Sequence, residues 1–166
     1  MCQSIEHKNH YTRARKKYQQ DSKYTHVDDE IYLSADLQKV ISLPRMGGFK
    51  LAIFNKRLTV FNETLAELGT GKSSYATIWH EATSGRMDED IASVFYAYLH
   101  KVRDMKKVVI WLYNCGAHNK NCCFFSMLAY LIYSEKVMHD MIELNTLRRD
   151  MHTCLQIQST SKLKKS

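Results

Sequence analysis

Residues 108–121, VVIWLYNCGAHNKN, decide the fold expected for this chain. The β-branched apolar start is typical of a strand buried inside a sheet, and the polar end leads into a second apolar segment of helical length. Residues 30–40, beginning EIYLSADLQ, alternate apolar and polar side chains and predict another strand. Asp36 stands near the carboxyl end of that strand, where the polar sites of α/β domains collect. These two strand ends are therefore the first candidate for a functional site.

Further strands are predicted between these two segments. Residues 49–54, 58–68 and 74–81 are rich in β-branched and aromatic side chains. Turn residues separate them, with glycines at 47, 48, 69 and 71. Together with residues 30–40 they predict an antiparallel meander of about three strands.

Two helices and two more strands complete the expected order. Residues 88–105 carry apolar side chains at helical spacing, with acidic residues first and basic residues near the end. A second helix, capped by Asn119 or Asn121 and running to about residue 138, is apolar nearly all round and should be buried. With strands at 106–112 and 141–147, the order predicts an α/β fold. Its mixed sheet has an antiparallel three-strand meander followed by parallel strands with crossover helices.

Charge divides the chain into three parts. Residues 1–25 hold six Lys or Arg and two acids, residues 160–166 add three lysines, and residues 26–159 hold fifteen charges of each sign. We therefore predict a basic N-terminal helix or arm (1–25), one folded domain (26–159) and a basic tail (160–166). Basic ends on a neutral body favour contact with nucleic acid, and solvated tails that aid solubility are the alternative.

The basic N-terminal segment predicts a helix over residues 5–20 with little apolar surface. Such a helix is exposed unless something docks on it. Its cations are interleaved with tyrosines, a composition suited to phosphate contacts and base stacking. The candidate nucleic-acid-binding residues are Arg13, Arg15, Lys16, Lys17 and Lys23.

Cysteine usage and hydropathy bear on the compartment. The five cysteines are an odd number without paired spacing, which favours free thiols and an intracellular location, with the nucleus compatible. The chain has no run of eighteen apolar residues and begins without the apolar core of a signal peptide, so we expect no membrane contact. The cysteine and histidine spacings match no standard zinc site, and Gly69–Ser73 lacks the first glycine of a phosphate-binding loop, so no resident metal is predicted.

Several motifs resemble a transposase-like domain of uncharacterised animal proteins, whose fold is similar to RNase H. The resemblance covers roughly residues 5–159, and it includes EHKNHYTRARKKYQQDS as the segment before the domain. The stretches that carry it are ADLQKVISLP, FKLAIFNKRLTVFNETL, IWHEATSGRMDEDIASVFYAYL and VVIWLYNCGAHNKN. It implies an RNase-H-like mixed sheet.

The resemblance also implies a site of three carboxylates around two Mg²⁺ ions, which clamp the oxygens of a phosphoryl displacement. Asp36 matches the first carboxylate, but Tyr113 stands at the second position and Gln158 at the third. A phenol and an amide are poor ligands for hard cations. We therefore expect Asp36 to be vestigial and the ancestral Mg²⁺ site to be lost.

These observations predict a transposon-derived, catalytically inactive domain with weak, non-specific affinity for nucleic acid through its basic ends. One alternative is an active Mg²⁺- or Mn²⁺-dependent nuclease using Asp36 with a substitute acid such as Glu81. Another is a non-enzymatic module whose N-terminal helix binds a protein. DNA sequence preference and oligomeric state are left open by the sequence.

Overall fold

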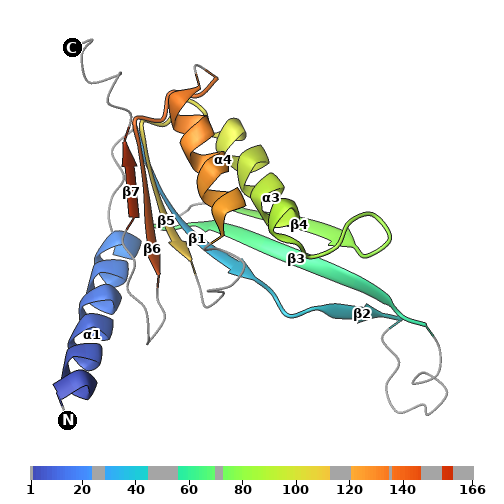
Figure 1. Cartoon of the computed structure of the whole chain (residues 1–166), viewed down its shortest axis with the longest axis horizontal. Coiled ribbons are helices and arrows are strands. Elements are labelled where there is room, and N and C mark those ends of the chain that lie inside the picture. The colour runs from blue at the N-terminus through green and yellow to red at the C-terminus, as the bar shows by residue number, and fades with distance from the viewer. Residues whose placement is uncertain are drawn as a thin grey trace.

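The computed structural model describes residues 2–23, 29–44, 56–69, 73–112, 121–134, 136–146 and 155–158, with side chains described from residue 12 onward except at 155 and 156. These residues form a mixed α/β architecture in which three helices flank a sheet of parallel and antiparallel strands (Figure 1). The expected strand over residues 49–54 and the basic tail lie outside the described residues. The mixed sheet predicted from the element order is confirmed.

The sheet is built around β1 (Glu30–Leu37). On one side β1 pairs antiparallel with β3 (Leu58–Glu67), which pairs in turn with β4 (Ser74–His80). On the other side β1 pairs parallel with β5 (Lys107–Leu112), followed by parallel β6 (Met141–Thr146) and antiparallel β7 (Leu155–Gln158). The strand order is therefore β4-β3-β1-β5-β6-β7.

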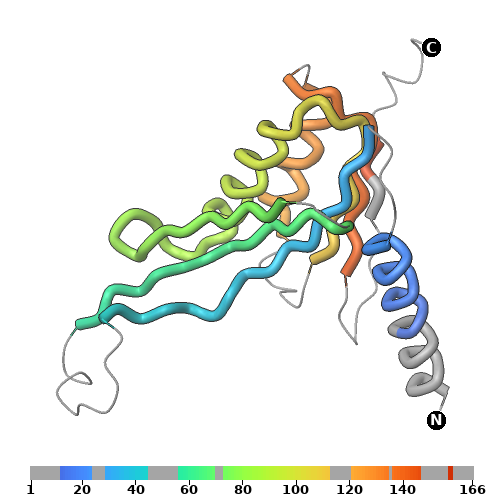
Figure 2. The backbone as a smooth tube through the Cα atoms, turned by 180° about the vertical axis from the view of Figure 1, so that it is seen from behind, coloured from blue at the N-terminus to red at the C-terminus, as the bar shows by residue number. Residues whose placement is uncertain are grey.

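The short strand β2 (Ile41–Leu43) continues along the same side of β3 as β1. Asp36 is opposite Thr64, whereas Ile41 is opposite Val60, so the register shifts by one residue between the two strands. One extra residue on one strand of an antiparallel pair makes a bulge, which bends the sheet. Beyond this point β2 and the adjoining end of β3 extend away from the helices (Figure 2).

Two helices, α3 (Asp88–Lys101) and α4 (Cys122–Tyr133), cover the side of the sheet that we call the front face (Figure 1). Their apolar stripes bury Phe95 and Phe124 edge to face, with ring centroids 4.9 Å apart. Beneath them lie inward-pointing side chains of the central strands, among them Leu33, Ala35 and Leu65. This front core is the larger of the two.

The helix α4 is buried on one face and exposed on the other, which its nearly uniform apolar sequence does not suggest. Phe124, Leu128 and Leu131 are fully buried, but Tyr130 and Tyr133 are 51% and 60% exposed. The expectation of burial all round was therefore wrong, and the helix also ends at Tyr133 rather than near residue 138. A tyrosine can keep its hydroxyl in water, so an apolar count that includes tyrosines overstates burial.

Among the described residues, no helix combines the length and hydropathy needed to cross a membrane.

The opposite side, the back face, is partly covered by α1 (Cys2–Lys23). Ala14 and Tyr18 of this helix pack against a small buried cluster of Tyr32, Leu68, Val109 and Trp111. The Tyr18 ring meets the Trp111 ring edge to face at 5.4 Å. The basic segment is thus helical as predicted, and the body of the protein itself provides the surface on which it docks.

Candidate functional site

Asp36 lies near the carboxyl end of β1 and belongs to the back face. Its strand partner is Thr64, and its neighbours on β1 alternate between the front core and the back face, with Ala35 buried in front and Tyr32 behind. The amide of Gln38 donates to Asp36 Oδ2 at 3.3 Å.

A second carboxylate, Glu63 on β3, lies close enough to Asp36 to interact electrostatically. Its side chain is 1% exposed, and neither carboxylate oxygen has a hydrogen-bond partner among the described residues. Burial, reinforced by the nearby charge of Asp36 and opposed by Arg86, raises the pKa of Glu63 to about 8. At neutral pH this side chain is therefore mainly a protonated carboxylic acid.

Sequence reasoning missed Glu63, although the sequence contains a signal for it. Along β3 the buried side chains are Phe61, Glu63 and Leu65, so a carboxylate occupies an inward position of an alternating strand. The face of β3 that points to the core can be identified only once Phe61 and Leu65, on either side of Glu63, are assigned to the core.

Arg86, just before α3, is a cation whose charge acts on Glu63. It lowers the pKa of Glu63, and its buried Nε has no hydrogen-bond partner in the part of the chain that the structure describes. No ion pair joins Arg86 to Glu63 among the described residues. The buried acid and the partly buried Arg86 side chain thus influence each other through space without an ion pair.

The two carboxylates do not form a pair of ligands for a metal. Glu63 is opposite Leu37, which packs in the front core, whereas Asp36 is opposite Thr64, so the two side chains leave adjacent strands on opposite faces. Divalent Mg²⁺ requires convergent anionic oxygens, and a protonated acid is not one. Nowhere in the described part of the chain do three or more His, Cys, Asp or Glu side chains gather as a metal site would require.

The third expected ligand position, Gln158, does not meet Asp36. Gln158 is opposite Met141, which aligns through Lys107 with Glu30 at the far end of β1. Asp36 lies six positions further along β1 than Glu30, a distance of about 20 Å. Tyr113 and the segment 114–120 lie outside the described residues.

Glu81, the suggested substitute ligand, follows β4 and is distant from Asp36. Its carboxylate accepts the backbone N–H of Thr59 at 2.9 Å, and this bond lowers the pKa of the exposed Glu81. Because β4 pairs with β3 and not with β1, Glu81 does not lie beside Asp36.

A denser polar cluster lies where α1 meets the back face. The Lys17 ammonium forms an ion pair with Glu143 of β6, and Asn145 donates to the same carboxylate at 2.9 Å. Trp111 Nε1 donates to Asp21 Oδ2 at 2.9 Å. Burial raises the pKa of Asp21, and the Trp111 hydrogen bond opposes that rise. These contacts fix the face of α1 that contains residues 14, 17, 18 and 21.

Four further cations of α1 point away from the sheet. Arg13, Arg15, Lys16 and Lys23 are exposed, and within the described residues no acidic side chain is paired with any of them. We call these four residues the basic α1 surface. Lys17 was predicted to belong with them, but in the structure its ammonium is engaged by Glu143.

Comparisons with known proteins add little to this description. No family model matches the chain, and no curated protein matches it. Among solved structures it is similar to the crystal structure of the N. crassa QDE-2 AGO MID-PIWI domains, with a TM-score of 0.42 and 12% sequence identity. That match covers 82% of this chain and 39% of the other. A likeness this distant supports no conclusion about activity or ligands.

Proposed function

We propose that this chain is an RNase-H-like, transposase-derived domain that has lost catalysis and binds nucleic acid without sequence specificity through the basic α1 surface. The proposal combines the sequence resemblance with three features of the structure. They are the strand order, the disposition of Asp36 and Glu63, and the outward cations of α1.

The strand order supports the RNase-H-like assignment. An antiparallel β1, β3 and β4 meander is followed by α3, β5, α4 and β6, and β5 and β6 add in parallel on the other side of β1. This is the arrangement that the resemblance implies.

The geometry at Asp36 supports the loss of catalysis. A two-metal phosphoryl-transfer site needs several convergent carboxylates. In the described part of this chain, the acid on which the charge of Asp36 acts, Glu63, faces the other side of the sheet and holds its proton at neutral pH. The residues present therefore do not fit the metal pair that the family uses.

The single observation that carries the binding proposal is that one face of α1 is docked on the sheet while the other presents exposed cations. One face is held on the sheet by Ala14, Tyr18 and the Lys17–Glu143 ion pair. The other face presents Arg13, Arg15, Lys16 and Lys23 without acidic partners. Cations on a helix that is fixed to a folded body can contact successive phosphates, and their contribution falls as salt rises.

Fluorescence anisotropy with labelled duplex DNA over a range of KCl concentrations tests the proposal. The wild-type chain should bind unrelated DNA sequences with similar affinity, and log K should fall linearly with log salt. The triple variant Arg13→Gln/Arg15→Gln/Lys16→Gln should bind weakly and have a slope smaller by about one unit per removed phosphate contact.

A matched triple variant controls for net charge. Lys39, Lys56 and Arg103 are exposed cations of the folded body, and replacing all three with Gln removes the same charge. This control should retain most of the affinity. No binding by the wild type at low salt, or equal losses in the two triple variants, would contradict the role of α1.

A further inference from the structure

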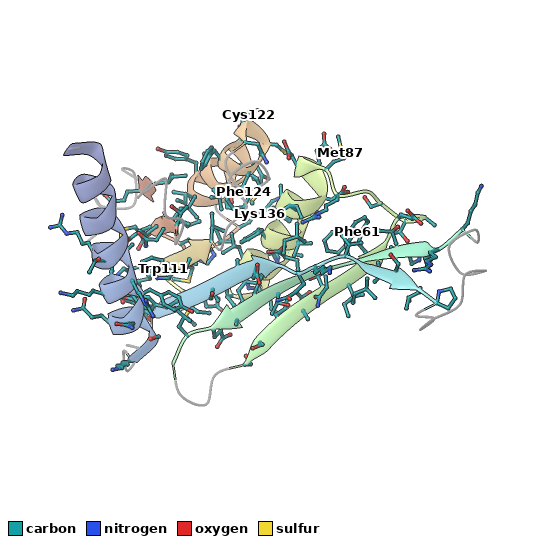
Figure 3. The ribbon with its side chains drawn as sticks, turned by 90° about the horizontal axis from the view of Figure 1, so that it is seen from below. Phe61, Met87, Trp111, Cys122, Phe124 and Lys136 are labelled. Carbon is teal, nitrogen blue, oxygen red and sulfur yellow. The ribbon has the colours of Figure 1, made fainter. Side chains whose placement is uncertain are left out.

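β4 is an open edge of the sheet. It pairs with β3 on one side, and no described strand pairs with its other side. In Figure 3 this green strand forms the outer border of the sheet beside β3. The edge matters because unpaired N–H and C=O groups can accept another strand.

The register identifies the groups that point outward. Glu81 N–H donates to Thr59 C=O, and Glu67 N–H donates to Ser73 C=O, so the odd-numbered residues of β4 are the ones hydrogen-bonded to β3. The even-numbered residues direct their backbone groups to the open side. The His80 carbonyl is used by the turn that follows, which leaves Ala76 and Ile78 as the central free positions.

This edge lacks the features that usually prevent strand pairing. The sequence of β4, SYATIWH, contains no proline, lysine, arginine or carboxylate. Ile78 is 67% exposed, the largest exposed fraction among the large apolar side chains described. The two other strands that pair on one side, β2 and β7, have three and four residues, whereas β4 has seven.

We infer that β4 pairs antiparallel with β4 of a second copy of this chain, about a two-fold axis at Thr77, to join two sheets into one. In this register Ala76 is opposite Ile78 of the second copy, and each such pair exchanges both N–H···O=C bonds. An interface of this kind is self-complementary, as a two-fold dimer requires.

The side chains fit this register on both faces. On the back face the large Ile78 meets the small Ala76, so the exposed apolar side chain gains a neighbour without a clash. On the front face Thr77 meets Thr77, and Tyr75 meets Trp79. Cross-strand Thr–Thr and aromatic pairs each favour strand association. No like charges are placed opposite each other, because the strand contains none apart from the titratable His80.

Light scattering and sedimentation of the full chain test the inference. The wild type should be a dimer at micromolar concentration. Ala76→Pro removes an N–H that points to the open side, so it should leave the fold intact and give a monomer. Ile78→Lys would place one lysine from each copy in the paired strands of the dimer, so this variant should also be a monomer.

The control variant is Met138→Lys, which adds the same charge at a side chain that is 55% exposed and lies away from β4. It should remain dimeric, and circular dichroism should be unchanged in all three variants. A Thr77→Cys variant should form a disulfide between copies under mild oxidation, beyond the background given by the chain's own five cysteines.

A monomeric wild type at every concentration would overturn the inference and leave the edge for a strand of another protein. A dimer that survives both Ala76→Pro and Ile78→Lys would overturn it as well. DNA binding by the basic α1 surface is measured separately, so failure here leaves the proposed function standing.

Discussion

The carboxylates of Asp36 and Glu63 leave neighbouring strands on opposite faces of the sheet, yet the charge of Asp36 still helps to raise the pKa of Glu63. The two carboxylates differ in their exposure to water. Glu63 is enclosed, whereas Asp36 is half-buried and hydrogen-bonded by Gln38. Burial therefore makes one of the pair an acid that keeps its proton at neutral pH.

Replacing Glu63 with Gln should change how stability depends on pH. The pKa of Glu63 is raised from 4.5 to about 8, so from pH 4.5 upward the unfolded state ionises while the folded state keeps its proton. The free energy of unfolding should therefore fall between pH 4.5 and 8, by several kcal/mol at about 1.4 kcal/mol per pKa unit. Glu63→Gln should remove most of this fall.

Urea unfolding at pH 5 and pH 8.5 measures the effect. The two proteins should be similar at pH 5, and the variant should be the more stable at pH 8.5. Glu89→Gln, at an exposed position in the first turn of α3, is the matched control and should keep the wild-type pH dependence. If the free energy of unfolding fell equally with pH in the wild type and in Glu63→Gln, Glu63 would have an ordinary pKa.

The disposition of Asp36 predicts that the chain does not cleave DNA. Supercoiled plasmid incubated with the protein and Mg²⁺ or Mn²⁺ should be nicked no faster than in buffer, because convergent anionic ligands are needed to hold the metal pair. Asp36→Asn should behave like the wild type. Metal-dependent nicking that Asp36→Asn abolishes and the control Glu81→Gln retains would establish the nuclease alternative instead.

Anchoring of α1 through Lys17 gives a third prediction. The carboxylate of Glu143 is 7% exposed, and it accepts a hydrogen bond from Asn145, so Lys17→Ala removes the cation that neutralises a nearly buried charge. Lys17 itself is 44% exposed, which limits the expected loss of stability to about 1 kcal/mol. Loosening of α1 should also uncover Trp111.

Acrylamide quenching detects this exposure in a Trp79→Phe background, where Trp111 is the remaining tryptophan of the two in the chain. Quenching should increase in Lys17→Ala. Lys16→Ala removes the adjacent cation, which points away from the sheet, and should have no effect on quenching. Unchanged quenching in Lys17→Ala would mean that Ala14 and Tyr18 hold the helix alone.

Most of the helices and strands could be predicted from local sequence patterns, because apolar side chains recur at a different spacing in a helix than in a strand. The alternation over residues 30–40 and the helical spacing over 88–105 correspond to β1 and α3, with ends that differ by a few residues. The strand predicted over residues 106–112 is β5 (Lys107–Leu112), buried on both faces as its sequence suggests. The parallel pairing of β5 with β1 follows from the crossover through α3.

The candidate site was less predictable because it depends on long-range register. Nothing local in the sequence states that Glu63 lies beside β1 rather than at a sheet border, or that Gln158 lies at the opposite end of the sheet from Asp36. The docking of α1 was missed for a similar reason. Its attachment uses Lys17 and Asp21 as much as its two apolar contacts, and their partners Glu143 and Trp111 are distant in sequence.

Asn121 provides a local test of one prediction that the structure does confirm. Its side-chain oxygen accepts the N–H of Phe124 at 2.7 Å and so caps α4. Asn121→Ala removes this acceptor and should lower the free energy of unfolding by about 1 kcal/mol, whereas Asn121→Ser keeps an acceptor and should cost less. Chemical denaturation of the three proteins side by side measures both differences. Equal stability of the alanine variant and the wild type would show that α4 is held by Phe124, Leu128 and Leu131 in the front core without help from its cap.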